Sequence, residues 1–129
     1  MKRFAVSAEK PGSGAPRVSV QGEIDMATVD VVRRQAHRQI ELHGPGLVLD
    51  LVRTSFMDSS GLHLIEALSR RTSAQGGAFV LVVATYPLRR LLEIAPPPSH
   101  VLVVVAGSPR DAAAMNQRLS PHSGRTVAA

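Results

Sequence analysis

The segment from Leu47 to Leu68 limits the possible folds more than any other part of this chain. Its first residues, Leu47–Leu51, form an apolar run with the length and residue types of a buried strand. Its last residues predict a helix, because Leu62, Ile65 and Leu68 recur at three-residue steps and so share one helical face. We expect the intervening segment 52–57 to be a short polar loop. A buried strand followed by an amphipathic helix favours an α/β fold.

The predicted helix begins with the small polar sequence Asp58-Ser59-Ser60-Gly61. Asp58 or Ser59 can cap the helix, since a short side-chain oxygen accepts a hydrogen bond from an unpaired first-turn N–H. The positive end of a helix favours an anion, and a hydroxyl placed there suits phosphorylation. A helix cap and a phosphorylation site are therefore both open interpretations of this sequence.

The N-terminal part predicts an antiparallel hairpin and a helix. Lys2–Ala8 and the alternating segment Arg17–Gln21 are the candidate strands, separated by turn-forming residues. Gly22–Asp25 ends the second strand and leads into a helix from about Ala27 to Leu42. Thr28 can cap this helix, with Asp25 as the alternative.

The C-terminal part alternates strands and helices. The expected elements are a strand at Phe79–Val83, a short helix at Pro87–Ile94, a strand at Val101–Val105 and a helix at Pro109–Leu119. Such alternation implies parallel pairing with right-handed crossovers. The predicted fold class is α/β, a single domain over residues 1–119 with a mixed four- to five-stranded sheet and flanking helices. We expect residues 120–129 to be a disordered tail.

Composition excludes several kinds of protein. The chain has 129 residues, 44% of them hydrophobic and 19% charged, which fits one globular domain. It has no cysteine, so disulfides, zinc–thiolate sites and cysteine catalysis are excluded. No apolar run has the length of a membrane span, and the first residues lack the apolar core of a signal peptide. We expect a cytoplasmic protein that does not bind membranes.

The net charge of +5 makes nucleic acid the first partner to consider. Aromatic residues are only 3% of the chain, which leaves few rings to stack on bases. The arginine pairs at 33–34, 70–71 and 89–90 lie on separate predicted helices, where a solvated face explains them. We therefore expect no nucleic-acid partner, and the basic surface could instead match a partner of opposite charge.

Three segments resemble a known family. Ser55–Leu62 resembles the phosphorylation loop of the STAS domain, as found in bacterial anti-sigma factor antagonists, where Asp-Ser-Ser/Thr-Gly-Leu joins a strand to a helix. Val18–Asp25 matches the strand of that family ending in Gly-Glu-Leu/Ile-Asp, and Gly76–Val83 matches a later strand. The resemblance extends over residues 4–118. It implies the mixed sheet with flanking helices that the patterns predict.

The resemblance also implies a function. The unmodified protein binds an anti-sigma factor, a serine-protein kinase carrying ATP or ADP, and thereby frees a sigma factor. Phosphorylation of Ser59, or alternatively of Ser60, ends this binding, and a phosphoserine phosphatase restores it. The chain itself would be no enzyme, hold no metal or cofactor, and be a monomer or weak dimer.

Nine residues are the expected partner contacts. Phe56 and Met57 have two readings, as core residues or as an exposed contact that a partner buries. The expected contacts are Asp25, Phe56, Met57, Asp58, Ser59, Ser60, Gly61, Leu62 and His63.

Alternative functions were weighed against this one. A Ser-His-Asp hydrolase using Ser59 lacks the Gly-x-Ser-x-Gly elbow, and a receiver-like phosphoacceptor at Asp50 lacks the neighbouring acids that would bind Mg²⁺. A STAS scaffold subunit of a larger, stressosome-like signalling assembly stays as the second hypothesis.

The chain departs from the family at Ile94–Ser99, where three prolines replace a Gly-Leu-like segment, and at His63, which replaces a small residue.

Overall fold

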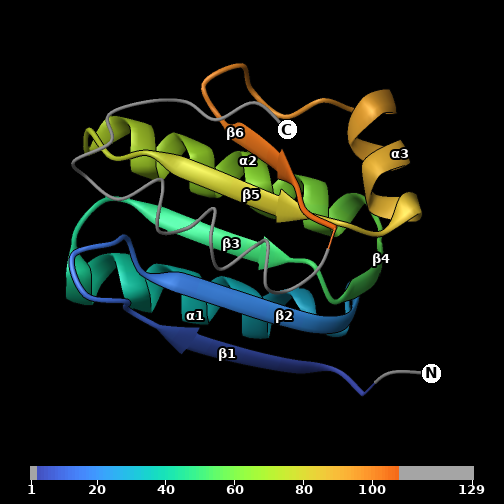
Figure 1. Ribbon diagram of the computed structural model, residues 1–129, viewed down its shortest axis with the longest axis horizontal. Helices are drawn as coiled ribbons and strands as arrows, with labels where there is room; N and C mark the ends of the chain where they lie inside the picture. Colours follow the sequence, from blue (N-terminus) through green and yellow to red (C-terminus); the bar gives the residue numbers. More distant parts are fainter. Residues whose placement is uncertain (1–2, 108–129) are drawn as a thin grey trace.

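The computed structural model describes residues 3–107 of the chain (Figure 1). The elements in chain order are β1 (Ala5–Glu9), β2 (Arg17–Ile24), α1 (Val29–His43), β3 (Leu47–Leu51), β4 (Thr54–Met57), α2 (Ser59–Ala74), β5 (Phe79–Val83), α3 (Tyr86–Ile94) and β6 (Leu102–Val105). The predicted helix Pro109–Leu119 and the predicted tail 120–129 lie outside the described residues. None of the helices within residues 3–107 combines the length and apolarity needed to cross a membrane.

The sheet is mixed, as predicted. Its strand order is β1-β2-β3-β5-β6, with β1 antiparallel to β2 and the remaining neighbours parallel. The predicted N-terminal hairpin and the predicted parallel pairing of the later strands are therefore confirmed. The α/β fold class is confirmed as well.

The expected loop at 52–57 is wrong, because its last four residues form strand β4, which brings the sheet to six strands instead of the predicted four to five. Strand β3 pairs with the first half of β2, at Arg17–Ser19, and β4 pairs in parallel with the second half of β2. A register irregularity between Gly22 and Glu23 accompanies the change of partner, and Gly22 has φ +100°, which favours glycine. The backbone thus shifts sideways after β3 and carries residues 54–57 to the end of β2.

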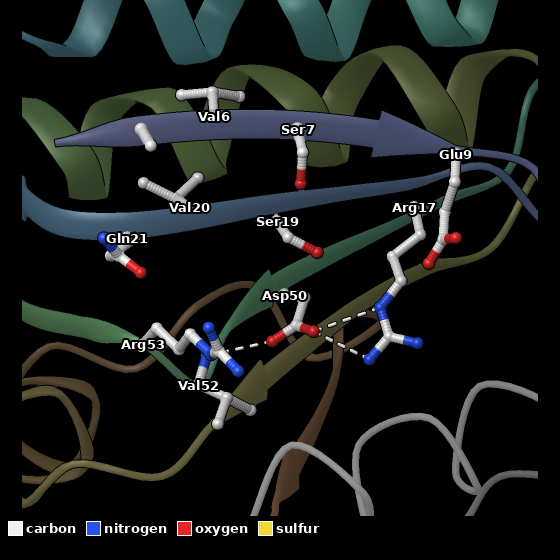
Figure 2. Close-up of a pocket in the computed structure, with 11 residues that line it drawn as sticks. Val6, Ser7, Glu9, Arg17, Ser19, Val20, Gln21, Asp50, Val52 and Arg53 are labelled. Carbon is white, nitrogen blue, oxygen red and sulfur yellow. Dashed lines mark hydrogen bonds and ion pairs between the residues drawn. The ribbon is translucent and has the colours of Figure 1, made fainter.

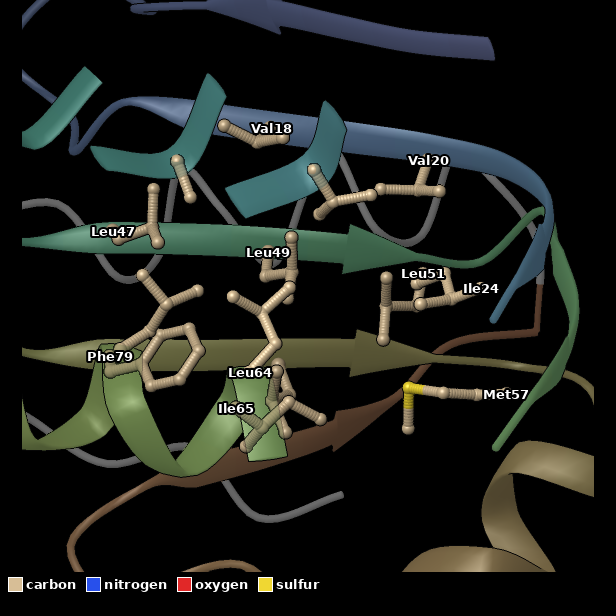
Figure 3. Close-up of a cluster of buried hydrophobic side chains, with 14 of the residues drawn as sticks. Val18, Val20, Ile24, Leu47, Leu49, Leu51, Met57, Leu64, Ile65 and Phe79 are labelled. Atoms are coloured by element: carbon tan, nitrogen blue, oxygen red, sulfur yellow. The ribbon is translucent and has the colours of Figure 1, made fainter. Parts of the chain in front are cut away.

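Helices α1 and α2 cover one face of the sheet and lie behind it in Figure 1. Alternate residues of each strand point toward them, so the apolar positions of β2, β3 and β5 meet the apolar stripes of the two helices. Figure 3 shows this core. Its fully buried large side chains include Phe79, Ile24, Leu47, Leu49, Leu51, Leu64, Ile65, Leu68, Leu81 and Leu88.

The opposite face of the sheet is apolar over β3, β5 and β6 and polar over β1 and β2. Val48, Val80, Val82 and Val104 form its apolar cluster. On the polar side, Arg17 of β2 donates from Nε (3.0 Å) and Nη2 (2.7 Å) to Oδ2 of Asp50 on β3. This ion pair lies in a pocket of about 370 Å³ on the sheet face, shown in Figure 2.

The contacts of Asp50 indicate a structural role for this residue. Its second carboxylate oxygen, Oδ1, accepts a hydrogen bond from the backbone N–H of Val52 at 3.0 Å. Both oxygens are therefore engaged inside the chain, one by Arg17 and one by the turn that leads into β4. The pair joins two neighbouring strands and helps to fix the point where the backbone leaves β3.

A histidine that lies between α1 and α2 is expected to make stability depend on pH. His37 Nδ1 lies 2.6 Å from an Nη1 donor of Arg71. Burial lowers the pKa of His37, and the charges of Arg71 and Arg33 lower it further, while Glu41 opposes them. The unfolded chain therefore binds a proton at a higher pH than the folded chain does. Stability should fall as the pH is lowered through about 6.5.

We expect the replacement His37→Gln to weaken this dependence, because glutamine can still accept a hydrogen bond from Arg71 but does not titrate. Thermal unfolding of both proteins at pH 7.5 and pH 5.5 is the measurement. The wild-type protein should lose more of its melting temperature on acidification than the variant. Equal losses would assign the effect to other histidines.

Candidate functional site

The segment that precedes α2 lies where the parallel strands end. Asp58 follows β4, and its backbone N–H donates to the carbonyl of Ile24, the last residue of β2, at 3.1 Å. Because β2, β4 and β5 run in the same direction, their carboxyl ends lie at one edge of the sheet. The β2–α1 loop, the start of α2 and the start of α3 therefore share this edge.

Asp58 is the N-cap of α2, so the first of the two predicted caps is the correct one. Its Oδ1 accepts the backbone N–H of Ser60 at 2.9 Å and also the Ser60 hydroxyl. The hydroxyl bond is the largest cause of the lowered pKa of Asp58, and the backbone N–H groups of Ser60 and Gly61 add to it. Asp58 is therefore a carboxylate at neutral pH, and this carboxylate cap is lost only in acid.

The two serines of the loop differ in exposure and in hydrogen bonding. Ser60 is half-buried and its hydroxyl is held by Asp58. Ser59 occupies the first position of α2, is exposed, and makes no side-chain hydrogen bond within the part of the chain that the structure describes. The accessible hydroxyl of this loop is that of Ser59.

Asp25 organises the start of α1 across the same edge. Its Oδ1 accepts the backbone N–H groups of Ala27 at 2.9 Å and Thr28 at 3.1 Å. Thr28 is the N-cap by position but makes no side-chain cap bond, since its hydroxyl donates to the carbonyl of Glu23 at 2.8 Å. Thr28, the first of the two predicted caps, thus holds the cap position, whereas the Asp25 carboxylate binds N–H groups of the turn that precedes α1. Asp25 stays half-buried beside the Ser59 loop.

The two apolar residues before Asp58 point in opposite directions. Met57 is only 3% exposed and packs in the core, so the expectation that it contacts a partner is wrong. Phe56, in contrast, is 48% exposed. The difference follows from β4 being a strand, because successive side chains of a strand alternate between faces. Of the other expected contacts, Gly61 is buried, Leu62 is half-buried and His63 is exposed.

Gly61 leaves space for Met57. A Cβ at position 61 would overlap the Cγ and Sδ atoms of Met57 and lie 3.3 Å from a methyl group of Ile24. We expect Gly61→Ala to destabilise the protein by about 1–3 kcal/mol, the usual range for overpacking of a core. Urea unfolding gives the value, and Gly61→Ala should cost less in a Met57→Ala background than in the wild type, because the overlapping atoms of Met57 are then absent. If Gly61→Ala is as stable as wild type, Met57 can move at no cost.

Sequence reasoning missed two exposed apolar residues at this edge. Met26, in the β2–α1 loop, is 83% exposed, and Tyr86, the first residue of α3, is 71% exposed. The hydroxyl of Thr85 donates to the carbonyl of Thr54 at 2.9 Å and so ties the start of α3 to β4. We call Met26, Phe56 and Tyr86 the apolar rim. Each of these residues is a single apolar residue near a junction between a strand and a helix. A single residue shows no periodic pattern, so nothing in the sequence indicated its exposure.

The site and the fold together define the class of protein. The chain belongs to the STAS domain family, whose model matches residues 9–97. Over 78 residues it is 35% identical to the anti-sigma F factor antagonist of Paenibacillus polymyxa, which covers 60% of this chain and 67% of that protein.

Solved structures agree on the fold. An anti-sigma factor antagonist from Mycobacterium paratuberculosis superposes with a TM-score of 0.69 at 24% identity, covering 89% of this chain and 95% of that one. The anti-sigma factor antagonist SpoIIAA in its unphosphorylated form gives 0.68 at 20% identity, over 88% of this chain and 96% of that one. The phosphorylated form of the Bacillus cell fate determinant SpoIIAA gives 0.64 at 20% identity, covering 86% and 98%.

Proposed function

We propose that this protein is an anti-sigma factor antagonist whose binding to an anti-sigma factor is switched off by phosphorylation of Ser59. The observation that carries the proposal is the exposed hydroxyl of Ser59 at the first position of α2, which has no hydrogen-bond partner among residues 3–107 and lies next to a serine whose hydroxyl is bound to Asp58. Two similar proteins support it. A 35% identical relative is called an anti-sigma F factor antagonist, and SpoIIAA has been solved in both unphosphorylated and phosphorylated forms.

The phosphoryl donor belongs to the partner. An anti-sigma factor with serine kinase activity transfers the γ-phosphoryl group of ATP to Oγ of Ser59, so that an O–P bond forms on the serine and ADP stays with the kinase. The chain contributes the accessible hydroxyl and the surface that holds it in place. A phosphatase returns Ser59 to its hydroxyl form by hydrolysing that bond.

The switch follows from charge at a contact surface. Phosphorylation adds about 1.5 to 2 negative charges and three acceptor oxygens at pH 7. At Ser59 these charges stand next to the Asp58 carboxylate, which is ionised at neutral pH as any ordinary aspartate is and whose pKa is lowered further by its hydrogen bonds. A partner surface fitted to the neutral hydroxyl would then face two adjacent anions. Desolvating them or placing them against acidic groups costs several kcal/mol.

The apolar rim supplies the attractive part of the interface. Met26, Phe56 and Tyr86 are large and exposed, and they lie in the β2–α1 loop, on β4 and at the start of α3, at the end of the sheet where Ser59 also lies. Aromatic and methionine side chains are enriched at protein interfaces, where a few of them carry most of the binding energy. A partner that covers the rim therefore also covers Ser59, which couples the modification to binding.

A pull-down and a phosphorylation assay test the proposal together. The full chain, Ser59→Ala, Ser60→Ala and Ser59→Asp are used as baits on the native cell lysate with ADP present. Retained complexes are then supplied with Mg²⁺ and ATP, and the phosphorylated residue is mapped by mass spectrometry. We expect a small ATP-binding kinase on every bait except Ser59→Asp, and phosphate on Ser59 of the wild type and of Ser60→Ala.

Two results would reject the proposal. Phosphate on Ser60 in the wild-type protein would move the site by one residue. Recovery of a large STAS assembly on all four baits would make the scaffold subunit the better description.

A further inference from the structure

A second apolar surface lies at the far end of α3, between that helix, the proline-rich loop and β6. It is a groove of about 360 Å³, near the lower end of the volumes seen for ligand pockets, and it suits one or two side chains. We call it the α3–β6 groove. Its lining residues are Val83, Arg89, Leu92, Glu93, Pro96, Pro97, Val103 and Val105.

The prolines make one wall of this groove and come from the segment where the chain departs from the family pattern. Pro96 and Pro97 have fixed φ angles and no backbone N–H, so their wall is stiff and offers no donor. Ile94, at the end of α3, is 67% exposed beside them. The proposed Ser59 switch uses the opposite end of α3, where Tyr86 lies, and does not account for these residues.

Strand β6 borders the groove and is the outermost strand of the sheet within the described part of the chain. Within residues 3–107, β6 pairs only with β5, so its outer side has no strand next to it. Edge strands usually carry a charge, a proline or a bulge that prevents further pairing. Leu102–Val105 has none of these, and Val105 is 39% exposed. The backbone N–H and C=O groups of this edge can pair with another extended chain.

The groove and the edge fit the same occupant. Val103 and Val105 alternate along β6 and both line the groove, while Leu102 and Val104 belong to the cluster on the other sheet face. A strand added beside β6 would place its own alternate side chains on the groove side. Arg90 bonds Glu93 at 3.2 Å, whereas Arg89 has no acidic side chain within 4 Å in the described part of the chain. Arg89 therefore favours an acidic residue in the occupant.

We propose that the α3–β6 groove is a second docking site, which takes an extended segment of a partner protein as an added strand on β6. The segment has apolar side chains at alternate positions, which fill the groove, and an acidic residue that faces Arg89. Main-chain hydrogen bonds to the edge give affinity and the groove gives specificity, as in other cases of strand addition. This docking site is independent of Ser59, so the protein can hold one partner while phosphorylation controls another.

Selection from a peptide library tests this inference. A phage-displayed library of random peptides of about ten residues is selected on the immobilised full-length protein, and enriched peptides are synthesised with a fluorophore. Their dissociation constants are measured with wild type, Val105→Lys, Arg89→Glu, Ser59→Asp and the control Leu42→Lys. Leu42 is an exposed apolar residue of α1, 59% accessible, and it does not line the groove. Circular dichroism and melting curves verify that each variant is folded.

We expect enriched peptides with alternating apolar residues and an acidic residue. Val105→Lys should weaken their binding by about tenfold or more, because it replaces an apolar groove residue by a charge at the edge strand. N-methylation of the peptide backbone should also weaken binding, because it removes the amide donors that pair with β6, and so should Arg89→Glu, because it places a carboxylate opposite the acidic residue of the peptide. Leu42→Lys and Ser59→Asp should bind like wild type. Peptides without this pattern, or equal binding by Val105→Lys, would overturn the inference. A dimer of the free protein that Val105→Lys dissociates, seen by analytical ultracentrifugation, would also overturn it, because a second copy would then be the occupant.

Discussion

Replacing Asp50 with alanine should destabilise the fold by about 3–5 kcal/mol, because it leaves the guanidinium group of Arg17 buried without its counter-charge. Arg17 is only 6% exposed, and two of its N–H groups donate to Asp50 Oδ2. The substitution also removes the acceptor for the N–H of Val52 at the turn into β4. Since domains are stable by about 5–15 kcal/mol, the loss is a large share of the total.

Urea unfolding followed by circular dichroism measures this loss of stability. Two further variants test whether it arises from the buried charge of Arg17. Glu66→Ala removes one side of the exposed pair with Arg70 and should change stability by less than about 0.5 kcal/mol. The double variant Arg17→Met, Asp50→Leu replaces the buried pair by apolar side chains and should recover most of the stability. If Asp50→Ala costs no more than Glu66→Ala does, water solvates Arg17 in the pocket and the pair is not structural.

The ion pair also shows where sequence reasoning reaches its limit. The mostly apolar segments Leu47–Leu51 and Phe79–Val83 predict their strands correctly. Each has the length of a strand and carries apolar residues on both faces, as a strand that is buried on both sides does. Which residues face each other is a matter of register, and Arg17 and Asp50 are 33 positions apart. No local pattern relates them, so the pairing became visible only when β2 and β3 were placed side by side.

Strand β4 was missed for a similar reason. Four residues, Thr54–Met57, are too few to show a clear period, and their pairing with β2 depends on the irregularity at Gly22. Without β4, the sequence could not tell that Phe56 points outward and Met57 inward. The Asp-Ser-Ser-Gly motif predicts the proposed site from the sequence, where the family resemblance already favours Ser59 over Ser60, and the hydrogen bond of Ser60 to Asp58 supports that preference.

The substitution Ser59→Asp should reduce affinity for the purified anti-sigma partner by about a hundredfold or more, equivalent to about 2.7 kcal/mol. The new carboxylate would lie beside the ionised Asp58, on the edge that also carries the apolar rim. Isothermal titration calorimetry with ADP present measures the change. Ser59→Ala should bind within a few-fold of wild type, because it removes only the hydroxyl.

Melting temperatures distinguish a loss of affinity at position 59 from a loss of affinity caused by unfolding. An acidic residue in the first turn of a helix interacts favourably with the helix dipole, so Ser59→Asp should melt at the same temperature as wild type or above it. Ser73→Asp is the matched control, since it adds the same charge to an exposed position in the last turn of α2, far from the apolar rim. It should lose a little stability to the dipole and keep full affinity. Equal losses of affinity in both variants would mean that total charge, rather than charge at position 59, controls binding.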